Sequence, residues 1–253
     1  MLHAIFPPRS RTVREMPPGR RAYAIGDIHG RLDLLTDLLG RIEEDSRARG
    51  PERPLIVFLG DIVDRGPGSA GVMNLLMAGL PWADLVCLMG NHEAAMLDAF
   101  AGDASAARMW LRQGGIETLA SFGVAADVLE TGDAAAIILA GRAAVGEVRR
   151  QWLEALPLSH WVGDYYFVHA GVRPGVPLDE QAPQDQLWIR TPFLGSRREH
   201  GALIVHGHTV GGAIDDRDNR LGLDTGAYKS GRLSAVGLEH RERWFLESAP
   251  LAA

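Results

Sequence analysis

Three short segments near the start of the chain combine glycine with side chains that bind metal ions. They read GDIHG at residues 26–30, GDIVDRG at residues 60–66 and GNHE at residues 90–93. Asp27 and His29 are two positions apart, which places both side chains on the same side of an extended chain. Aspartate, histidine and asparagine without a thiolate form a ligand set suited to manganese, iron, zinc or cobalt. The three segments together predict a divalent-metal site.

Each of these segments follows a short apolar run that predicts a buried strand. Strands are expected at residues 23–26, 55–60 and 85–89, and helices at residues 32–49 and 70–80. This β-α-β-α-β order is typical of an α/β fold. In an open α/β sheet, ligands bind beyond the carboxyl ends of the strands, so the three segments should converge on one crevice.

The remainder of the chain predicts a helical insertion followed by further strands. Residues 94–156 are rich in alanine, are interrupted by glycines and lack a convincing strand. Strands are then expected at residues 165–168, 203–206, 221–224, 233–238 and 243–246. We expect residues 1–19 to form an N-terminal tail or an edge arm, and residues 20–248 to form a single domain.

A simpler explanation exists for each segment taken alone. An isolated Gly-Asp or Gly-Asn turn often does no more than cap the helix that follows it. Three such turns in this order constrain about a dozen positions, which makes the metal site the better explanation. The glycines also fit, because a tight turn and a close approach to a ligand favour a residue without Cβ.

The ordered set GD-x-HG, GD-x-x-DRG and GNHE resembles the signature of the PPP branch of the calcineurin-like metallophosphoesterases. This family includes serine/threonine protein phosphatases, the bacteriophage lambda phosphatase and bacterial diadenosine tetraphosphate hydrolases. The resemblance covers about residues 21–247 and is strongest before residue 95. It implies an α/β fold in which a β-sandwich is flanked by helices in the layer order α/β/β/α, with the helical insertion at about residues 94–156.

The resemblance also implies two divalent ions, with manganese expected first and iron, zinc or cobalt as the other options. Asp61 would bridge the two ions. The remaining ligands would be Asp27 and His29 for one ion, and Asn91, His169 and His208 for the other. His206 lies two residues before His208 and could share its role, although alignment with the family favours His208. We interpret His206 as a residue that supports the site or packs against it.

The same resemblance assigns residues to catalysis and to substrate binding. A hydroxide between the two ions would attack phosphorus directly, without a phosphoenzyme. His92 would donate a proton to the leaving group, and Asp64 would orient and charge His92. Arg65, Asn91 and Arg190 would bind the phosphate.

The chain departs from the family near the substrate. Met89 stands before GNHE where many members have arginine, so one positive charge is missing. A different sequence also occupies the C-terminal loop, in which we interpret Asp224 as a turn residue and Tyr228 as a weak substrate contact. Trp110 is interpreted as a core residue, because apolar surroundings more often mark a core than a substrate cage.

We therefore predict an enzyme, a metal-dependent phosphatase for phosphoserine and phosphothreonine in proteins, with phosphotyrosine as a further option. Its partner would be a phosphoprotein or a phosphorylated small molecule. One alternative is a symmetrical diadenosine tetraphosphate hydrolase, which uses the same metals. Another is a non-catalytic binding scaffold on the same fold, whose mark would be the loss of metal ligands or of His92, and the sequence retains both.

Composition narrows the class of protein further. The 253 residues carry a formal net charge of −6, which argues against general binding to nucleic acid or to an anionic membrane. The single cysteine, Cys87, excludes an internal disulfide and a cysteine-rich metal site, and we expect a buried thiol. No apolar stretch approaches the roughly 20 residues of a membrane span, and the N-terminus does not read as a signal peptide. We expect a cytoplasmic protein.

Overall fold

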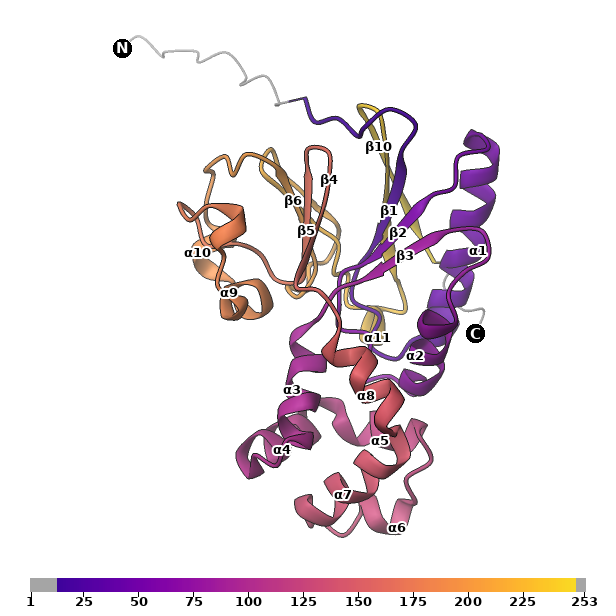
Figure 1. Cartoon of the computed structure of the whole chain (residues 1–253), viewed down its shortest axis with the longest axis vertical. Coiled ribbons are helices and arrows are strands. Elements are labelled where there is room, and N and C mark those ends of the chain that lie inside the picture. The colour runs from indigo at the N-terminus through magenta and orange to yellow at the C-terminus, as the bar shows by residue number, and fades with distance from the viewer. Residues whose placement is uncertain (1–12, 249–253) are drawn as a thin grey trace.

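Two five-stranded sheets lie face to face at the centre of the fold, with helices on both outer sides (Figure 1). The computed structural model describes residues 13–248. The first sheet has the strand order β10-β9-β1-β2-β3. Its strands are β1 (Arg21–Ile25), β2 (Leu55–Phe58), β3 (Asp84–Cys87), β9 (Ser234–Glu239) and β10 (Glu242–Glu247). Strands β1, β2 and β3 are parallel, whereas β9 is antiparallel to β1 and to β10.

The second sheet has the strand order β4-β5-β6-β8-β7. Its strands are β4 (Ser159–Val162), β5 (Tyr165–Val168), β6 (Leu203–His206), β7 (Asp215–Asp216) and β8 (Arg220–Gly222). Strands β5, β6 and β8 are parallel, and the two edge strands β4 and β7 are antiparallel to their neighbours. Each sheet therefore has a parallel set of strands whose carboxyl ends can present loops to a common site.

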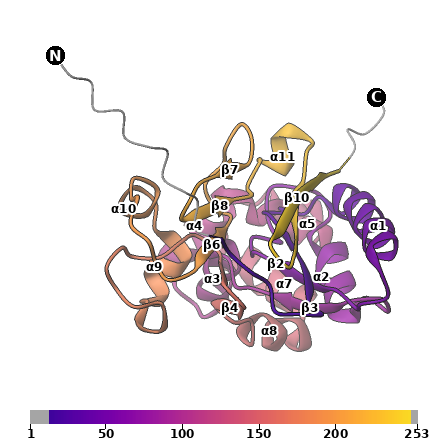
Figure 2. The same ribbon diagram turned by 90° about the horizontal axis from the view of Figure 1, so that it is seen from above.

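Helices cover the outer faces of the sandwich on opposite sides, as Figure 2 shows from above. Helices α1 (Leu32–Arg49) and α2 (Ser69–Ala78) flank the first sheet, and α9 (Pro183–Trp188) and α10 (Thr191–Leu194) flank the second. The insertion lies at one end of the sheets and consists of α3 (Asn91–Phe100), α4 (Ala104–Trp110), a π-helical segment (Leu111–Gly115), α5 (Ile116–Ser121), α6 (Ala126–Leu129), α7 (Ala134–Val145) and α8 (Glu147–Glu154). The predicted α/β/β/α sandwich with a helical insertion is confirmed.

Alternate residues of the central strands enter different core layers. In β1, Ala22 and Ala24 pack between the two sheets, whereas Tyr23 and Ile25 pack against α1 and α2 and belong to the same cluster as the core of the insertion. This alternation follows from the two-residue period of a strand. Because both faces are covered, the strand reads as a continuous apolar run in the sequence.

Short elements at the edges differ from the sequence prediction. Strand β4 was not expected, because its residues are mostly half-buried at a sheet edge and form no apolar run. Strand β7 has only two residues, and α9, α10 and α11 (Ala227–Ser230) have four to six, which is too short for a periodic pattern. Cys87 is half-buried at the end of β3, where burial raises the pKa of its thiol.

Part of the predicted N-terminal tail, residues 1–12, lies outside the described residues. Within the described part, Met16 is buried between the sheets, and its N–H donates to the carbonyl oxygen of His240 at 2.7 Å. Among the helices of residues 13–248, none is both long enough and apolar enough to cross a bilayer.

Gly237, at the centre of β9, provides a test of the packing between the first sheet and α1. A Cβ at this position would overlap the indole of Trp244, which is fixed by a 2.9 Å hydrogen bond to Asp45 and by the guanidinium of Arg49, 3.3 Å from its ring centre. We expect Gly237→Ala to lower the free energy of unfolding by about 1–3 kcal/mol. Urea denaturation followed by circular dichroism measures this change.

Gly40→Ala is the matched control. Gly40 is exposed on α1, and a Cβ there meets no neighbouring element. This substitution should raise the free energy of unfolding by roughly 0.5–1 kcal/mol, because alanine favours a helix. Equal stability of Gly237→Ala and the parent protein would contradict the packing described here.

Candidate metal centre and active site

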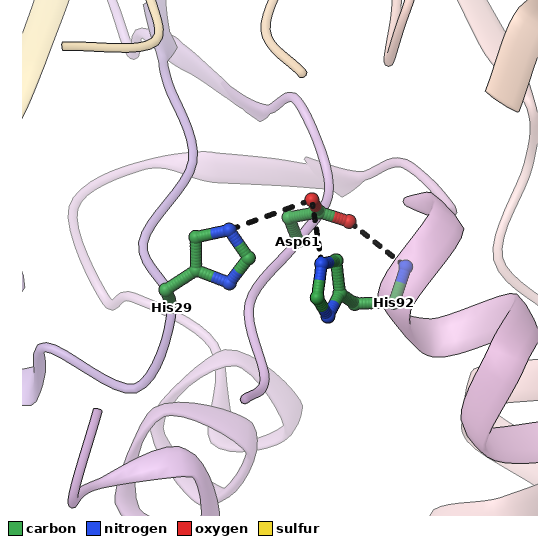
Figure 3. Close-up of side chains that lie close together, drawn as sticks. All are labelled: His29, Asp61 and His92. Carbon is green, nitrogen blue, oxygen red and sulfur yellow. Dashed lines mark hydrogen bonds and ion pairs between the residues drawn. The ribbon is translucent and has the colours of Figure 1, made fainter. Parts of the chain in front are cut away.

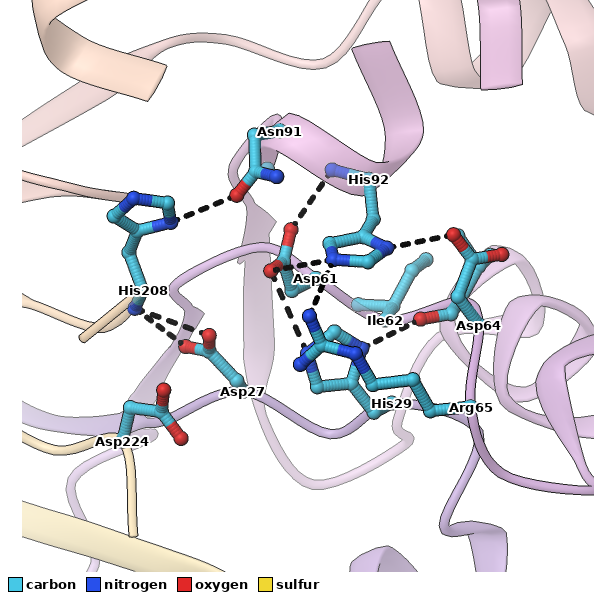
Figure 4. Close-up of polar contacts among 12 residues, drawn as sticks. Asp27, His29, Asp61, Ile62, Asp64, Arg65, Asn91, His92, His208 and Asp224 are labelled. Carbon is cyan, nitrogen blue, oxygen red and sulfur yellow. Dashed lines mark hydrogen bonds and ion pairs between the residues drawn. The ribbon is translucent and has the colours of Figure 1, made fainter. Parts of the chain in front are cut away.

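The predicted site residues meet at the carboxyl ends of strands from both sheets (Figure 4). Asp27 and Asp61 follow β1 and β2, and His92 lies in the first turn of α3, after β3. His169 and His208 follow β5 and β6 of the second sheet. All five side chains are at most 6% exposed, so the sandwich brings them together in an environment that water hardly reaches.

The backbone of this site is strained. Within residues 13–248, six residues other than glycine have positive φ, and five of them belong to the site: His29, Asp61, Asp64, Arg65 and His208. Each such conformation costs about 1–3 kcal/mol and persists only where the surrounding structure holds it. The loops at the strand ends must therefore be held by specific contacts.

Glu93 supplies such contacts for the loop that carries Asp61. Its buried carboxylate accepts the backbone N–H groups of Gly90, Asp61 and Ile62 at 2.9 Å and of Val63 at 3.1 Å. Burial, together with the nearby charge of Asp61, raises the pKa of Glu93 to about 8. No role for Glu93 follows from GNHE alone. Its bond to the N–H of Gly90 is one half of a capping box, and glycine at the N-cap has no side chain to form the other half.

Two imidazoles have their tautomer fixed by backbone carbonyls. The carbonyl of Val63 lies 2.8 Å from Nδ1 of His29, and that of Leu59 lies 2.8 Å from Nδ1 of His169. A carbonyl can only accept, so Nδ1 carries a proton in both rings, and Nε2 is the nitrogen left to bind a metal ion. Burial lowers the pKa of His29 to about 3, which keeps that ring neutral. Both rings are thus held in the form that binds a metal ion.

The Nε2 atoms of His29 and His169 face other acceptors, whereas Nδ1 of His208 carries the ring proton, because its Nε2 accepts from Arg190. Nε2 of His169 lies 2.8 Å from Oδ1 of Asn91 and 3.4 Å from Oδ1 of Asp61, and Nδ1 of His208 lies 2.8 Å from the same Asn91 oxygen. Nε2 of His29 lies 3.6 Å from Oδ2 of Asp61. Acceptor atoms that face one another without a proton between them repel. A cation among them would remove that repulsion, so this set of ligand atoms fits a divalent metal.

Within residues 13–248, two groups of side chains are close enough to hold an ion. Asp61, His169 and His208 form one, and His29, Asp61 and His92 form the other, which Figure 3 shows. Within each group the potential ligand atoms lie within 4.8 Å of one another. Asp61 belongs to both groups, which is the geometry that a bridging carboxylate requires.

Asp27 lies beside these groups and faces other carboxylates. Its oxygens accept the N–H of His208 at 3.0 and 3.1 Å. Burial, together with the charges of Asp224 and Asp61, raises the pKa of Asp27 well above its usual value. Asp224 accepts the N–H of Gly226 at 2.9 Å, as in a turn, but it is also 96% buried next to Asp27 (Figure 4). Asp27, Asp61 and Asp224 are thus three carboxyl groups buried close together, and bound cations would offset the repulsion between their charges.

His92 and Asp64 form a buried pair at the edge of the site. Nδ1 of His92 donates to Oδ2 of Asp64 at 2.6 Å, and Nε2 faces Oδ2 of Asp61 at 3.9 Å. Burial lowers the pKa of His92, but the charges of Asp61 and Asp64 outweigh it and raise that pKa above its usual value. Trp110 and Thr118, from the insertion, also donate to Asp64. Trp110 is thus both a core residue, as interpreted from the sequence, and a hydrogen-bond donor.

Arginines approach the site from two sides. The guanidinium of Arg65 donates to Nε2 of His29 at 2.7 Å, and it lies 2.9 Å from Nε2 of His92 and 4.6 Å from the ring centre of Tyr228. Arg190 is exposed, and its Nε donates to Nε2 of His208 at 3.1 Å. Both cations therefore lie next to candidate metal ligands, where they could contact an anionic substrate.

His206 lies apart from the two groups of candidate ligands. Its Nδ1 donates to the carbonyl of Gly207 at 3.0 Å, and its ring packs edge-on against Phe193 with 5.0 Å between ring centres. Burial lowers the pKa of His206 to about 4.

Met89 stands where many family members have arginine. Its side chain is buried, with 9% of its surface exposed.

Comparison with known proteins agrees with this site. The model of the calcineurin-like phosphoesterase family matches residues 20–235. The chain belongs to this family. It is therefore a metallophosphoesterase, and the resemblance read from GDIHG, GDIVDRG and GNHE is confirmed at the level of the family.

Curated relatives of this metallophosphoesterase carry two kinds of name. Serine/threonine-protein phosphatase 1 of Salmonella typhimurium is 38% identical over 38% of this chain and 39% of its own length. The symmetrical bis(5'-nucleosyl)-tetraphosphatase of Dechloromonas aromatica is 31% identical over 60% of this chain and 44% of its own length. The chain thus spans less than half the length of either relative. Serine/threonine-protein phosphatase 2 of Salmonella typhimurium is 28% identical over 85% of this chain and 91% of its own length.

Solved structures show the same metallophosphoesterase fold. A structure described as a putative diadenosine tetraphosphatase matches with a TM-score of 0.61 at 21% identity, over 92% of this chain and 96% of that one. A cold-active protein-tyrosine phosphatase of a Shewanella species matches with a TM-score of 0.57 at 18% identity, over 94% of this chain and 85% of that one. At this level of identity the match shows the fold alone.

The role of Glu93 in this metallophosphoesterase can be tested by Glu93→Gln. The amide would place an NH₂ group against backbone N–H donors, leaving at least one of them unsatisfied. We expect the free energy of unfolding to fall by about 1–3 kcal/mol, as measured by urea denaturation. Glu130→Gln, at an exposed position after α6, should change it by less than about 0.5 kcal/mol. The assignment is wrong if the two variants are equally stable.

Proposed function

We propose that this metallophosphoesterase is a phosphoprotein phosphatase that hydrolyses phosphoserine and phosphothreonine monoesters, with phosphotyrosine as a further substrate class. The observation that carries the proposal is the placement of the metal-binding groups, the His92–Asp64 pair and Arg65 in one buried site. Hydrolysis of a phosphate ester needs all three: polarised phosphoryl oxygens, a proton for the leaving group and positive charge on the phosphate.

The proposal includes two divalent ions, with manganese as the first expectation. Asp27, His29 and Asp61 would hold one ion, and Asp61 would also hold the second. The other ligands of the second ion would be Asn91, His169 and His208. When bound, such a pair of ions polarises phosphoryl oxygens and activates a water molecule. The buried neutral imidazoles and the three crowded carboxylates support this assignment.

The residues of the chain divide the remaining work between proton transfer and binding. His92 would donate its proton to the leaving alkoxide, because the carboxylates around it raise its pKa and favour the protonated ring. Asp64 would hold that ring through Nδ1. Arg65, Arg190 and the amide of Asn91 would bind the oxygens of the phosphate.

A symmetrical dinucleoside tetraphosphatase is the second candidate. Relatives with that name are 31% identical to this chain over 60% and 72% of its length, but the aligned segments cover only 44% and 51% of those relatives. The phosphatase 2 of Salmonella typhimurium aligns over 91% of its own length. This difference in coverage supports the protein phosphatase. A scaffold without catalysis is disfavoured, because candidate metal ligands and His92 lie together in the site.

Substrate choice is tested by measuring kcat/KM with Mn²⁺ on a phosphoserine peptide, a phosphothreonine peptide and diadenosine tetraphosphate. We expect faster hydrolysis of the peptides, loss of activity with a chelator, and no metal-dependent turnover by Asp61→Asn, which removes the charge of the bridging carboxylate. Faster hydrolysis of the tetraphosphate would favour the second candidate. Absence of hydrolysis on every substrate would reject the enzymatic proposal, and full activity of Asp61→Asn would reject the two-metal site.

The role of His92 is tested by His92→Asn with two leaving groups. We expect kcat to fall by about 10²–10⁴ for an alkyl phosphate, the usual effect of removing a positioned acid. The loss should be smaller for p-nitrophenyl phosphate, because its leaving group needs no proton. His240→Asn, in the exposed turn between β9 and β10, is the control, since asparagine tolerates the positive φ found there. Equal losses on both substrates would count against a proton donor.

A further inference from the structure

The carboxylate of Asp64 is surrounded by hydrogen-bond donors from two parts of the chain. His92, on α3, donates to Oδ2 at 2.6 Å. The other donors come from later in the insertion: Nε1 of Trp110 lies 2.9 Å from Oδ2 and 3.1 Å from Oδ1, and the hydroxyl of Thr118 donates to Oδ1 at 2.7 Å. Asp64, Trp110 and Thr118 are all fully buried. Both oxygens of Asp64 are thus occupied, and water does not compete for them.

Thr118 holds the backbone of Asp64 as well as its side chain. The N–H of Asp64 donates to Oγ1 of Thr118 at 2.8 Å, and the hydroxyl of Ser69 lies 3.1 Å from that oxygen. Asp64 has a φ of 71°, a conformation that costs free energy for a residue with a side chain. The hydroxyl of Thr118 therefore supports the conformation that aims this carboxylate at His92.

The backbone of the insertion lies directly against the loop that carries Asp64 and Arg65. Trp110, Gly114 and Thr118 are spaced four residues apart, and the segment between the first two is π-helical. Gly114 has a φ of 119°, and a Cβ there would overlap the backbone nitrogen of Arg65. The carbonyl of Gly114 accepts the N–H of Arg65 at 3.4 Å. The helical path therefore breaks at Gly114, which brings the insertion against the loop that carries Asp64 and Arg65.

We propose that Trp110 and Thr118 are positioning residues, which orient Asp64 and through it the imidazole of His92, so that the helical insertion forms part of the proton-donating apparatus. The inference rests on the proposed function, because it concerns the leaving-group proton. Without the indole N–H, the carboxylate of Asp64 loses one of the donors that fix its orientation and can rotate away from Nδ1 of His92. The ring of His92 then loses the fixed orientation that its other nitrogen would need to donate a proton to the leaving group.

The test uses Trp110→Phe, which keeps an aromatic ring against Phe100 and removes the indole N–H together with part of the ring system. Loss of one such hydrogen bond should lower kcat on an alkyl phosphate by about 3- to 10-fold with little change in KM. The effect should be smaller on p-nitrophenyl phosphate. Trp152→Phe, on α8 of the same insertion and against the same core cluster, is the matched control and should show no dependence on the leaving group.

A second pair of variants addresses Thr118. Thr118→Val removes the hydroxyl at nearly constant volume and should give the same dependence on the leaving group, whereas Thr118→Ser should recover most of the loss. In the His92→Asn background, Trp110→Phe should cause no further loss of kcat. Equal losses on both substrates, or an undiminished loss in that background, would show that Trp110 acts only in packing and would overturn the proposal.

A proton NMR spectrum separates this inference from the proposed function. The Nδ1–H of His92, donated to a carboxylate at 2.6 Å, should give a downfield imidazole signal that is absent in His92→Asn. Trp110→Phe should shift or broaden that signal, and Trp152→Phe should not. A shifted signal in a protein without phosphatase activity would support the positioning and reject the proposed function. An unchanged signal in Trp110→Phe would reject the positioning even in an active enzyme.

Discussion

The buried carboxylate of Asp61 is stable only next to positive charge. Loops from both sheets therefore place imidazoles and candidate metal ligands around it. Burial raises the pKa of such a group, and positive charge on the imidazoles of His169, His92 and His29, between 3.4 and 3.9 Å away, lowers it. The ring of His29 is itself neutral, so bound cations would supply charge that the imidazoles do not. A charge buried without partners would cost more free energy than the fold has to spare. The sandwich is therefore an electrostatic requirement as well as a packing arrangement, since His29 and His92 come from one sheet and His169 from the other.

This constraint explains why the whole-chain charge says little about the substrate. The formal net charge of −6 argues against broad binding to nucleic acid, which spreads over a large surface. The site is small, and several acids counted in that total lie within it. Arg65 and Arg190 lie beside the candidate ligands. Bound cations would be the largest local charges there and would favour a compact phosphoryl group despite the acidic exterior.

Short-range sequence patterns predict the central strands and much of the candidate site. Buried strands read as apolar runs, and glycine followed by a ligand residue at each strand end is a short-range pattern, so the site loops after β1, β2 and β3 could be placed from the sequence. Asp224 illustrates the limit. Its turn role is local, but its position next to Asp27 depends on how β8 of the second sheet packs against the first. Glu93 is similar, because its four backbone partners lie on a loop about thirty residues away and on its own helix start.

Trp110 shows why packing and function cannot be assigned to separate residues here. Its ring packs against Phe100, with 5.5 Å between ring centres, and is fully buried in the cluster that joins the insertion to the first sheet. The same ring donates to Asp64, so the burial that stabilises the insertion also sets the position of the donor. A hydrogen bond weakens steeply with misalignment, and a close-packed interior transmits small displacements. A change anywhere in this cluster that moves α4 therefore also moves the pair that includes His92, which makes the insertion inseparable from the site.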